Sequence, residues 1–220
     1  MNVPVFCSQS VSDTFSCFIS CKDSLSALQC LGICHKEGDC LALKEKALRR
    51  LDEKLRKKGI PYAIGGDWLL FTEGLTDSYH TFDVYVPAEH GQAASAVFER
   101  LGMCASRQEN QDTLEAEYHF DGADFTFHAG FCAMPGVRIC LDDVQNFRHE
   151  EIPGASVPVF SLEDAYVIAL LCHREQDAAL LETHFQAHGF QHPERFLNGA
   201  VQPVPEDIQR RIQPWISNTH

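Results

Sequence analysis

The chain has 220 residues, with 31 acidic and 18 basic side chains and a formal charge of −13. This excess of negative charge disfavours extended binding to nucleic acid and suits a small substrate that arrives with cations. No apolar run approaches the roughly 18 residues that cross a bilayer, and the first residues lack the basic and apolar regions of a signal peptide. We therefore expect a soluble, cytoplasmic protein with no membrane partner.

Residues 1–40 form a Cys-rich segment that holds six of the ten cysteines. Without a signal peptide we expect reduced thiols. The run from Cys30 through Cys34 and His35 to Cys40 offers ligands for Zn²⁺ or an iron–sulfur cluster, but its spacing fits no familiar site. Packing of Cys17 and its helical neighbours on one face of an amphipathic helix is the favoured interpretation. A third interpretation is unselected sequence appended by a start codon assigned too early.

Residues 41–58 predict a helix, because Leu48, Leu51 and Leu55 recur on one face and Gly59 follows as a stop signal. Eight of the 18 basic residues lie in this segment. Such a face offers a contact for RNA or for an acidic partner, although a solvated helix surface is the more common outcome.

Residues 62–87 carry the most informative pattern. A strand at 62–65 runs into Gly65 and Gly66, a short helix follows at 67–73, and a strand at 81–87 contains Asp83. Paired glycines let the backbone approach a phosphate closely at a helix N-terminus. A carboxylate on the neighbouring strand suits the Mg²⁺ that accompanies such a phosphate.

Downstream, helical and strand patterns alternate and then give way to consecutive strands, which predicts an α+β fold with a mixed sheet and helices packed on it. The predicted elements are a helix at 91–101 and strands at 114–120, 123–128 and 137–141. Asp121 and Gly122 predict a hairpin turn. Asp124 alternates with Phe125 and Phe127 on a strand, a placement that favours a functional carboxylate.

Residues 153–158 resemble a linker, and the chain beyond them predicts helices to about residue 217. The expected organisation is a Cys-rich segment at 1–40, an α/β core at 41–152 and a C-terminal helical region at 153–220.

The motif at 62–87 resembles the signature of the minimal nucleotidyltransferases of the DNA polymerase-β-like superfamily, in which a Gly-Gly-Ser turn and a short helix precede Thr-x-Asp-hydrophobic-Asp. Gly65, Gly66, Thr81 and Asp83 match it, and Asp124 stands where a third carboxylate is expected. The resemblance implies that Asp83 and Asp124 are catalytic residues that bind Mg²⁺. An NTP then donates its nucleoside monophosphate to a hydroxyl on a small molecule, an RNA end or a protein.

Three further residues bear on the resemblance. Tyr85 replaces the second Asp and Asp67 replaces the Ser. The run from Arg174 to Asp177 resembles an Arg-x-Lys-Asp element that packs near the nucleotide in relatives, although Gln176 replaces the Lys. The resemblance implies a nucleotide-binding role for Arg174 beside Gly65, Gly66 and Asp67, and a surface ion pair between Arg174 and Asp177 is the alternative. Because a neutral phenol is a poor metal ligand, Tyr85 also supports a rival interpretation, a degenerate relative that binds nucleotide or another protein, as in toxin–antitoxin pairs.

Other catalytic patterns are absent from the sequence, including a Gly-x-Ser-x-Gly elbow, a His-Glu-x-x-His motif and a P-loop. His80, His119 and His128 fall near the expected site, but each is more typical of a strand end or a surface.

Overall fold

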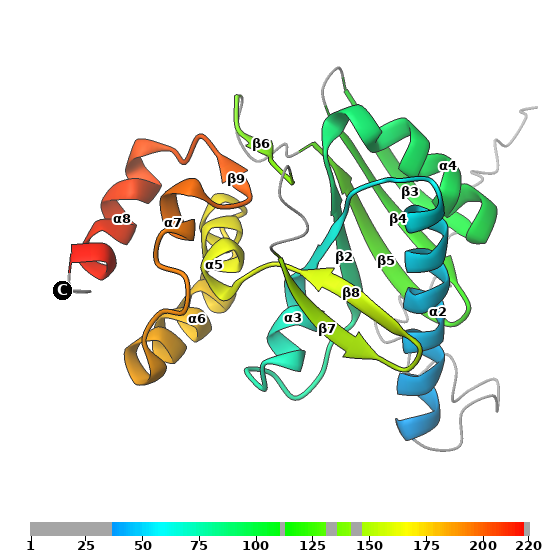
Figure 1. Cartoon of the computed structure of the whole chain (residues 1–220), viewed down its shortest axis with the longest axis horizontal. Coiled ribbons are helices and arrows are strands. Elements are labelled where there is room, and N and C mark those ends of the chain that lie inside the picture. The colour runs from blue at the N-terminus through cyan, green and yellow to red at the C-terminus, as the bar shows by residue number, and fades with distance from the viewer. Residues whose placement is uncertain (1–36, 111–112, 131–135, 142–146, 218–220) are drawn as a thin grey trace, which may run out of the picture.

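The computed structural model describes residues 37–110, 113–130, 136–141 and 147–217. A seven-stranded sheet has the order β3-β4-β5-β2-β1-β8-β7, and β6 and β9 form a separate two-stranded pair. β2 pairs in parallel with β5, and β1 in parallel with β8, whereas the other neighbours are antiparallel. The predicted α+β fold with a mixed sheet and C-terminal helices is therefore confirmed, as Figure 1 shows.

The elements of the sheet region are α2 (Glu37–Lys57), β1 (Ala63–Gly65), α3 (Gly66–Thr72), β2 (Thr81–Val86), η1 (Ala88–His90), α4 (Gly91–Leu101), β3 (Met103–Glu109), β4 (Leu114–Phe120), β5 (Ala123–Ala129), β6 (Arg138–Ile139), β7 (Arg148–Ile152) and β8 (Ala155–Val159). The C-terminal elements are α5 (Leu162–Leu171), α6 (Glu175–His188), α7 (Arg195–Asn198), β9 (Val201–Gln202) and α8 (Glu206–Ser217). In the described part of the chain, no helix combines the length and the apolar character needed to cross a bilayer.

One face of the sheet packs against α2 and α4. Phe98 of α4 stacks on Tyr118 with ring centroids 4.9 Å apart, and its ring also meets Phe125 and Phe127. Leu48, Leu51 and Leu55 of α2 are fully buried, as the amphipathic pattern predicted. Alternation along the strands therefore sends their other side chains, Asp83 and Asp124 among them, to the opposite face.

Strong sequence patterns located several elements well. The predicted bounds 91–101 and 114–120 coincide with α4 and β4. The predicted hairpin turn is also confirmed, since Asp121 and Gly122 both have positive φ between β4 and β5. The strand predicted at 137–141 shrinks to the two residues of β6, which pair with β9 outside the main sheet.

The expected linker at 153–158 is wrong. Residues 148–159 form the hairpin β7-β8 around Gly154, and β8 meets β1 at Ile64 and Val159. Pro158 is tolerated because β1 is short, so the proline faces no partner in β1 and pairs with His149 on the other side. The expectation also missed β3, because all of its side chains are exposed and no apolar alternation marks it.

The helix predicted at 41–58 begins earlier, at Glu37. The expectations for residues 1–36, including their thiols, a Zn²⁺ or iron–sulfur site and a helix around Cys17, lie outside the described residues. In the C-terminal region, α5 begins with a capping box, in which the Ser161 side chain accepts a hydrogen bond from the Asp164 N–H and the Asp164 side chain accepts one from the Ser161 N–H.

Candidate functional site

The turn between β1 and α3 is shaped by glycine. Gly66 has a φ of +68°, and a Cβ built there would lie 2.0 Å from Oδ2 of Asp83. Gly65 pairs with Asp83 across the strands, and a Cβ at Gly65 would approach the ring of Phe160 to 2.9 Å. Both positions therefore require glycine, because another part of the chain packs closely against each backbone. The Phe160 ring lies against Gly65, and the Asp83 carboxylate lies against Gly66.

Asp83 is a buried acid, with 7% of its surface exposed. Burial raises the pKa of Asp83 to about 7, with Arg174 lowering it and the negative charges of Asp67 and Asp177 raising it further. Nη1 of Arg174 lies 3.4 Å from Oδ2 of Asp83. The Asp83 carboxylate is thus held next to one fixed cation.

Arg174 comes from the turn that joins α5 to α6. Its backbone N–H donates to the carbonyl of Ala169, and His173 before it has a φ of +54°, which shapes the turn. Nε of Arg174 lies 3.5 Å from Oδ2 of Asp177. Burial lowers the pKa of Arg174, but the nearby Tyr85 and Asp83 outweigh this and raise it, so the guanidinium stays charged.

Asp67 lies in the first turn of α3. Its Oδ2 accepts a hydrogen bond from the backbone N–H of His80 at 2.7 Å, while its Oδ1 is buried with no hydrogen-bond partner. In the described residues, the buried side-chain polar atoms without such a partner are Asp67 Oδ1, Tyr79 Oη and Arg174 Nε. Two of these three atoms, an acceptor and a donor, belong to this site.

Asp124 shares a sheet face with Asp83 but has a different neighbour. It pairs with Thr81 in the parallel register of β2 and β5, and Thr126 is the residue opposite Asp83. Oδ1 of Asp124 lies 2.7 Å from Nδ1 of His119 on β4, and 40% of the Asp124 side chain is exposed. Among the residues that the structure describes, no three His, Cys, Asp or Glu side chains gather as a metal-binding group.

Tyr85 fills the position of the second carboxylate with a packed ring. It is 1% exposed and stacks on His128 with centroids 4.6 Å apart and planes 15° apart. Burial lowers the pKa of His128 to about 4, with Arg174 adding to the effect, so this imidazole is neutral at pH 7 even though Glu115 lies 3.4 Å away. No local sequence pattern predicts this stacked pair, because Tyr85 and His128 come from different strands.

Comparison with known proteins adds little at the level of sequence, since no protein family and no curated protein matches the chain. Among solved structures, a Thermotoga maritima protein assigned provisionally as a nucleotidyltransferase has a TM-score of 0.46 and 18% identity, over 65% of this chain and 92% of that one. The solution structure of the antibiotic-resistance factor ANT(2″)-Ia has a TM-score of 0.46 and 16% identity, over 66% of this chain and 85% of that one.

A crystal structure of ANT(2″)-Ia in complex with adenylyl-2″-tobramycin has a TM-score of 0.43 and 14% identity, over 80% of this chain and 98% of that one. All three scores are low and all three identities are below one fifth, so nothing about the site or the substrate of this chain follows from them.

We predict that Gly66→Ala destabilises the protein by about 3 kcal/mol or more, because the substitution adds a strained positive φ and a clash with Asp83. Gly74→Ala is the matched control, since Gly74 has the same φ of +68° and no atom within 4 Å of a built Cβ. Urea unfolding should give about 1 kcal/mol for this control. Adding Asp83→Ala should lower the cost of Gly66→Ala but leave it above the control value, because the Cβ of residue 83 still lies 2.9 Å from the built Cβ. Equal costs for Gly66→Ala with and without the Asp83 carboxylate would contradict the contact.

We also predict that Asp83→Asn stabilises the metal-free protein in EDTA, increasingly so as the pH rises. The pKa of Asp83 is about 7 in the folded state and about 3.9 when unfolded, so the folded state binds the extra proton between these values. Wild-type stability should therefore fall as pH rises from about 4 to about 7 and then level off. Unfolding curves should show the Asn variant gaining about 2–4 kcal/mol over this interval. A loss of stability in Asp83→Asn at pH 8 would contradict it, and Asp207→Asn on α8 should show no such trend.

Proposed function

We propose that this protein is a Mg²⁺-dependent nucleotidyltransferase that moves a nucleoside monophosphate from an NTP to a hydroxyl acceptor. One observation carries the proposal: a buried carboxylate oxygen of Asp67 with no hydrogen-bond partner, and a buried N–H of Arg174 that has an ion-pair contact with Asp177 at 3.5 Å but no hydrogen bond, lie beside the Asp83 carboxylate. A buried polar atom without a partner is uncommon and calls for an explanation. A phosphate with its cation supplies both partners, because phosphate oxygens accept from Arg174 and a cation is held by Asp67.

The donor set suits one hard cation better than two. Carboxylate oxygens are the ligands that Mg²⁺ prefers, and Asp67, Asp83 and Asp177 outnumber the single positive charge of Arg174. In this proposal Asp83 and Asp124 would hold Mg²⁺ together with the unpartnered oxygen of Asp67, next to the phosphates. When bound, the ion would neutralise phosphate charge and favour departure of pyrophosphate. Tyr85 supplies no carboxylate, and the bond from Asp124 to His119 must open before Asp124 faces β2.

The residues of the chain would contribute by positioning and by charge. Gly65 and Gly66 would admit the phosphates next to the β1-α3 turn, and Arg174 would turn from Asp83 to a phosphate oxygen. The acceptor oxygen would then attack the α-phosphorus in line with the leaving pyrophosphate, and the hydroxyl proton would leave to solvent. Alignment of the two substrates supplies most of the rate in such a transfer. The chain gives no reason to choose among a small molecule, an RNA end and a protein as the acceptor.

We predict that calorimetry detects binding of non-hydrolysable NTP analogues in Mg²⁺, and that EDTA weakens this binding at least about tenfold. Asp83→Asn and Asp67→Asn should each weaken it about tenfold or more, Asp124→Asn should weaken it as well, and Asp207→Asn should not. Thermal unfolding of each variant separates lost binding from lost folding. No binding of any analogue by the folded parent would overturn the proposal.

A second candidate function is a nucleotide-binding or protein-interaction module without catalysis. The packing of Tyr85 against His128 and the occupation of Asp83 by Arg174 favour it, since both reduce the space and the charge available for metal. Analogue binding without transfer to any hydroxyl acceptor would be its signature.

Arg174 gives a test with two opposite results. Arg174→Ala should increase the affinity for Mn²⁺ alone, because it frees the Asp83 carboxylate, and should decrease the affinity for the Mg²⁺–NTP analogue, because it removes the phosphate partner. We expect each change to be about tenfold, measured by paramagnetic resonance for Mn²⁺ and by calorimetry for the analogue. Arg174→Lys should give intermediate values. Equal losses of both affinities would instead assign Arg174 a purely structural role.

A further inference from the structure

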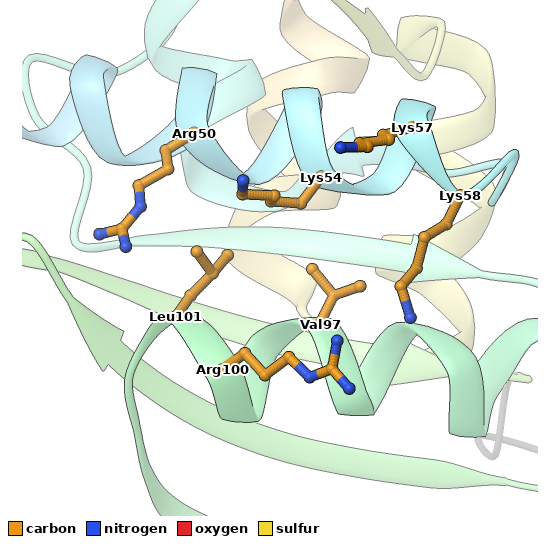
Figure 2. Close-up of a pocket in the computed structure, with 7 residues that line it drawn as sticks. All are labelled: Arg50, Lys54, Lys57, Lys58, Val97, Arg100 and Leu101. Carbon is orange, nitrogen blue, oxygen red and sulfur yellow. The ribbon is translucent and has the colours of Figure 1, made fainter.

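A basic groove runs between α2 and α4, on the opposite side of the sheet from Asp83. It has a volume of about 400 Å³ and is lined by Arg50, Lys54, Lys57, Lys58, Val97, Arg100 and Leu101. Val97 and Leu101 point from α4 toward α2, while Arg50 of α2 and Lys58, which directly follows α2, reach toward α4 (Figure 2). The floor is thus aliphatic and the rim is cationic.

Most of the groove's cations have no internal partner. Other basic residues of α2 are used within the fold, because Lys44 bonds to the carbonyl of Tyr79, Arg49 to that of Pro153 and Arg56 to Asp52. In the groove, Arg50 pairs with Asp121 at 2.9 Å.

The remaining rim residues are Lys54, Lys57, Lys58 and Arg100, and the side chains of these four have no hydrogen bond or ion pair within the described residues. None of the acidic side chains that the structure describes forms an ion pair with these four residues. The cluster is therefore available to an outside anion.

The layout fits an elongated anionic ligand. Arg50 and Lys57 are seven residues apart on α2, so this part of the rim extends about 10 Å along the helix, and Lys58 follows directly after it. A compact phosphate would contact only the cations at one end of this row and would not reach the cations at the other end. None of the described residues that line the groove is aromatic, whereas single-stranded nucleic acid is usually held by stacking of its bases on aromatic side chains.

We propose that this groove docks an acidic amphipathic helix of a partner protein. Apolar residues at helical spacing would cover Val97 and Leu101, and flanking carboxylates would face the lysines and Arg100. The chain as a whole has a formal charge of −13, so the cations of the groove supply a local attraction that orients the encounter with an acidic partner. Residues 1–36 contain two acidic and two basic side chains, so that segment offers no complementary charge.

The test uses the full chain and three fluorescein-labelled probes at about 0.15 M salt, with fluorescence anisotropy as the readout. The first probe is a helical peptide of about 16 residues with Leu at positions i, i+3, i+4 and i+7 and Glu on both flanks. The second peptide keeps its Glu residues but has Gln in place of Leu, and the third probe is an oligouridine of the same net charge. Protein variants are Lys54→Glu and Lys57→Glu, with Arg210→Glu on α8 as the matched charge control.

The proposal expects the Leu peptide to bind about tenfold more tightly than either other probe, and each groove variant to weaken it about tenfold while Arg210→Glu changes it less than twofold. Tighter binding of oligouridine would identify a nucleic-acid surface and overturn the proposal. Equal losses of affinity for the Leu peptide in Lys54→Glu, Lys57→Glu and Arg210→Glu would also overturn the proposal. Light scattering of the unmodified protein gives one more test. If the protein forms dimers and Lys54→Glu dissociates them, the groove binds a second copy of the chain, and the proposal of a partner protein is overturned.

Discussion

The buried Asp83 carboxylate is the constraint on which the site depends. It lies against Gly66 on one side and Arg174 on the other, so it connects the sheet to the turn between α5 and α6. Burying an ionised carboxylate is costly unless a charge partner and good geometry compensate, and its pKa near 7 shows that here the compensation is incomplete. The fold thus spends stability to keep a reactive oxygen at the start of α3, a common sign of a functional position.

The C-terminal helices hold Arg174 in place through a second set of buried acids. Glu163 accepts hydrogen bonds from the N–H groups of Gln191 and His192, and the fully buried Asp164 contacts Arg195 at 2.6 Å and the Ala200 N–H at 2.7 Å. Both acids sit in the first turn of α5, the helix that ends just before the Arg174 turn. Fixing the start of α5 therefore limits where its far end can carry the guanidinium.

Sequence patterns were sufficient where burial alternates strongly. The alternation in residues 114–120 and the Leu positions of residues 41–58 each reflect a surface that is half core and half solvent, and such patterns are legible without any partner. Sequence patterns did not predict β3 and β8, because the pairing of these strands depends on neighbours far away in the sequence rather than on their own composition.

For the site, the sequence marked Gly65, Gly66, Asp67, Asp83, Asp124 and Arg174. The contact between Asp83 and Arg174, the bond of Asp124 to His119 and the stacking of Tyr85 on His128 are tertiary, so no local signal encodes them.

Successive side chains of β2 face opposite sides of the sheet, and this alternation limits how the length of the chain can change during evolution. Phe82 and Val84 face the helices while Asp83 and Tyr85 face the opposite side, so one shifted residue would exchange the two sets. In the loop between α3 and β2, Asp77 and Ser78 are exposed whereas Tyr79 is buried, so added residues are tolerated at small entropic cost only near Asp77 and Ser78. Insertions can therefore accumulate at residues 77–78, whereas a single deletion inside β2 removes the core and the site together. Lineages of this protein are expected to vary in length at that loop and to keep β2 at constant length.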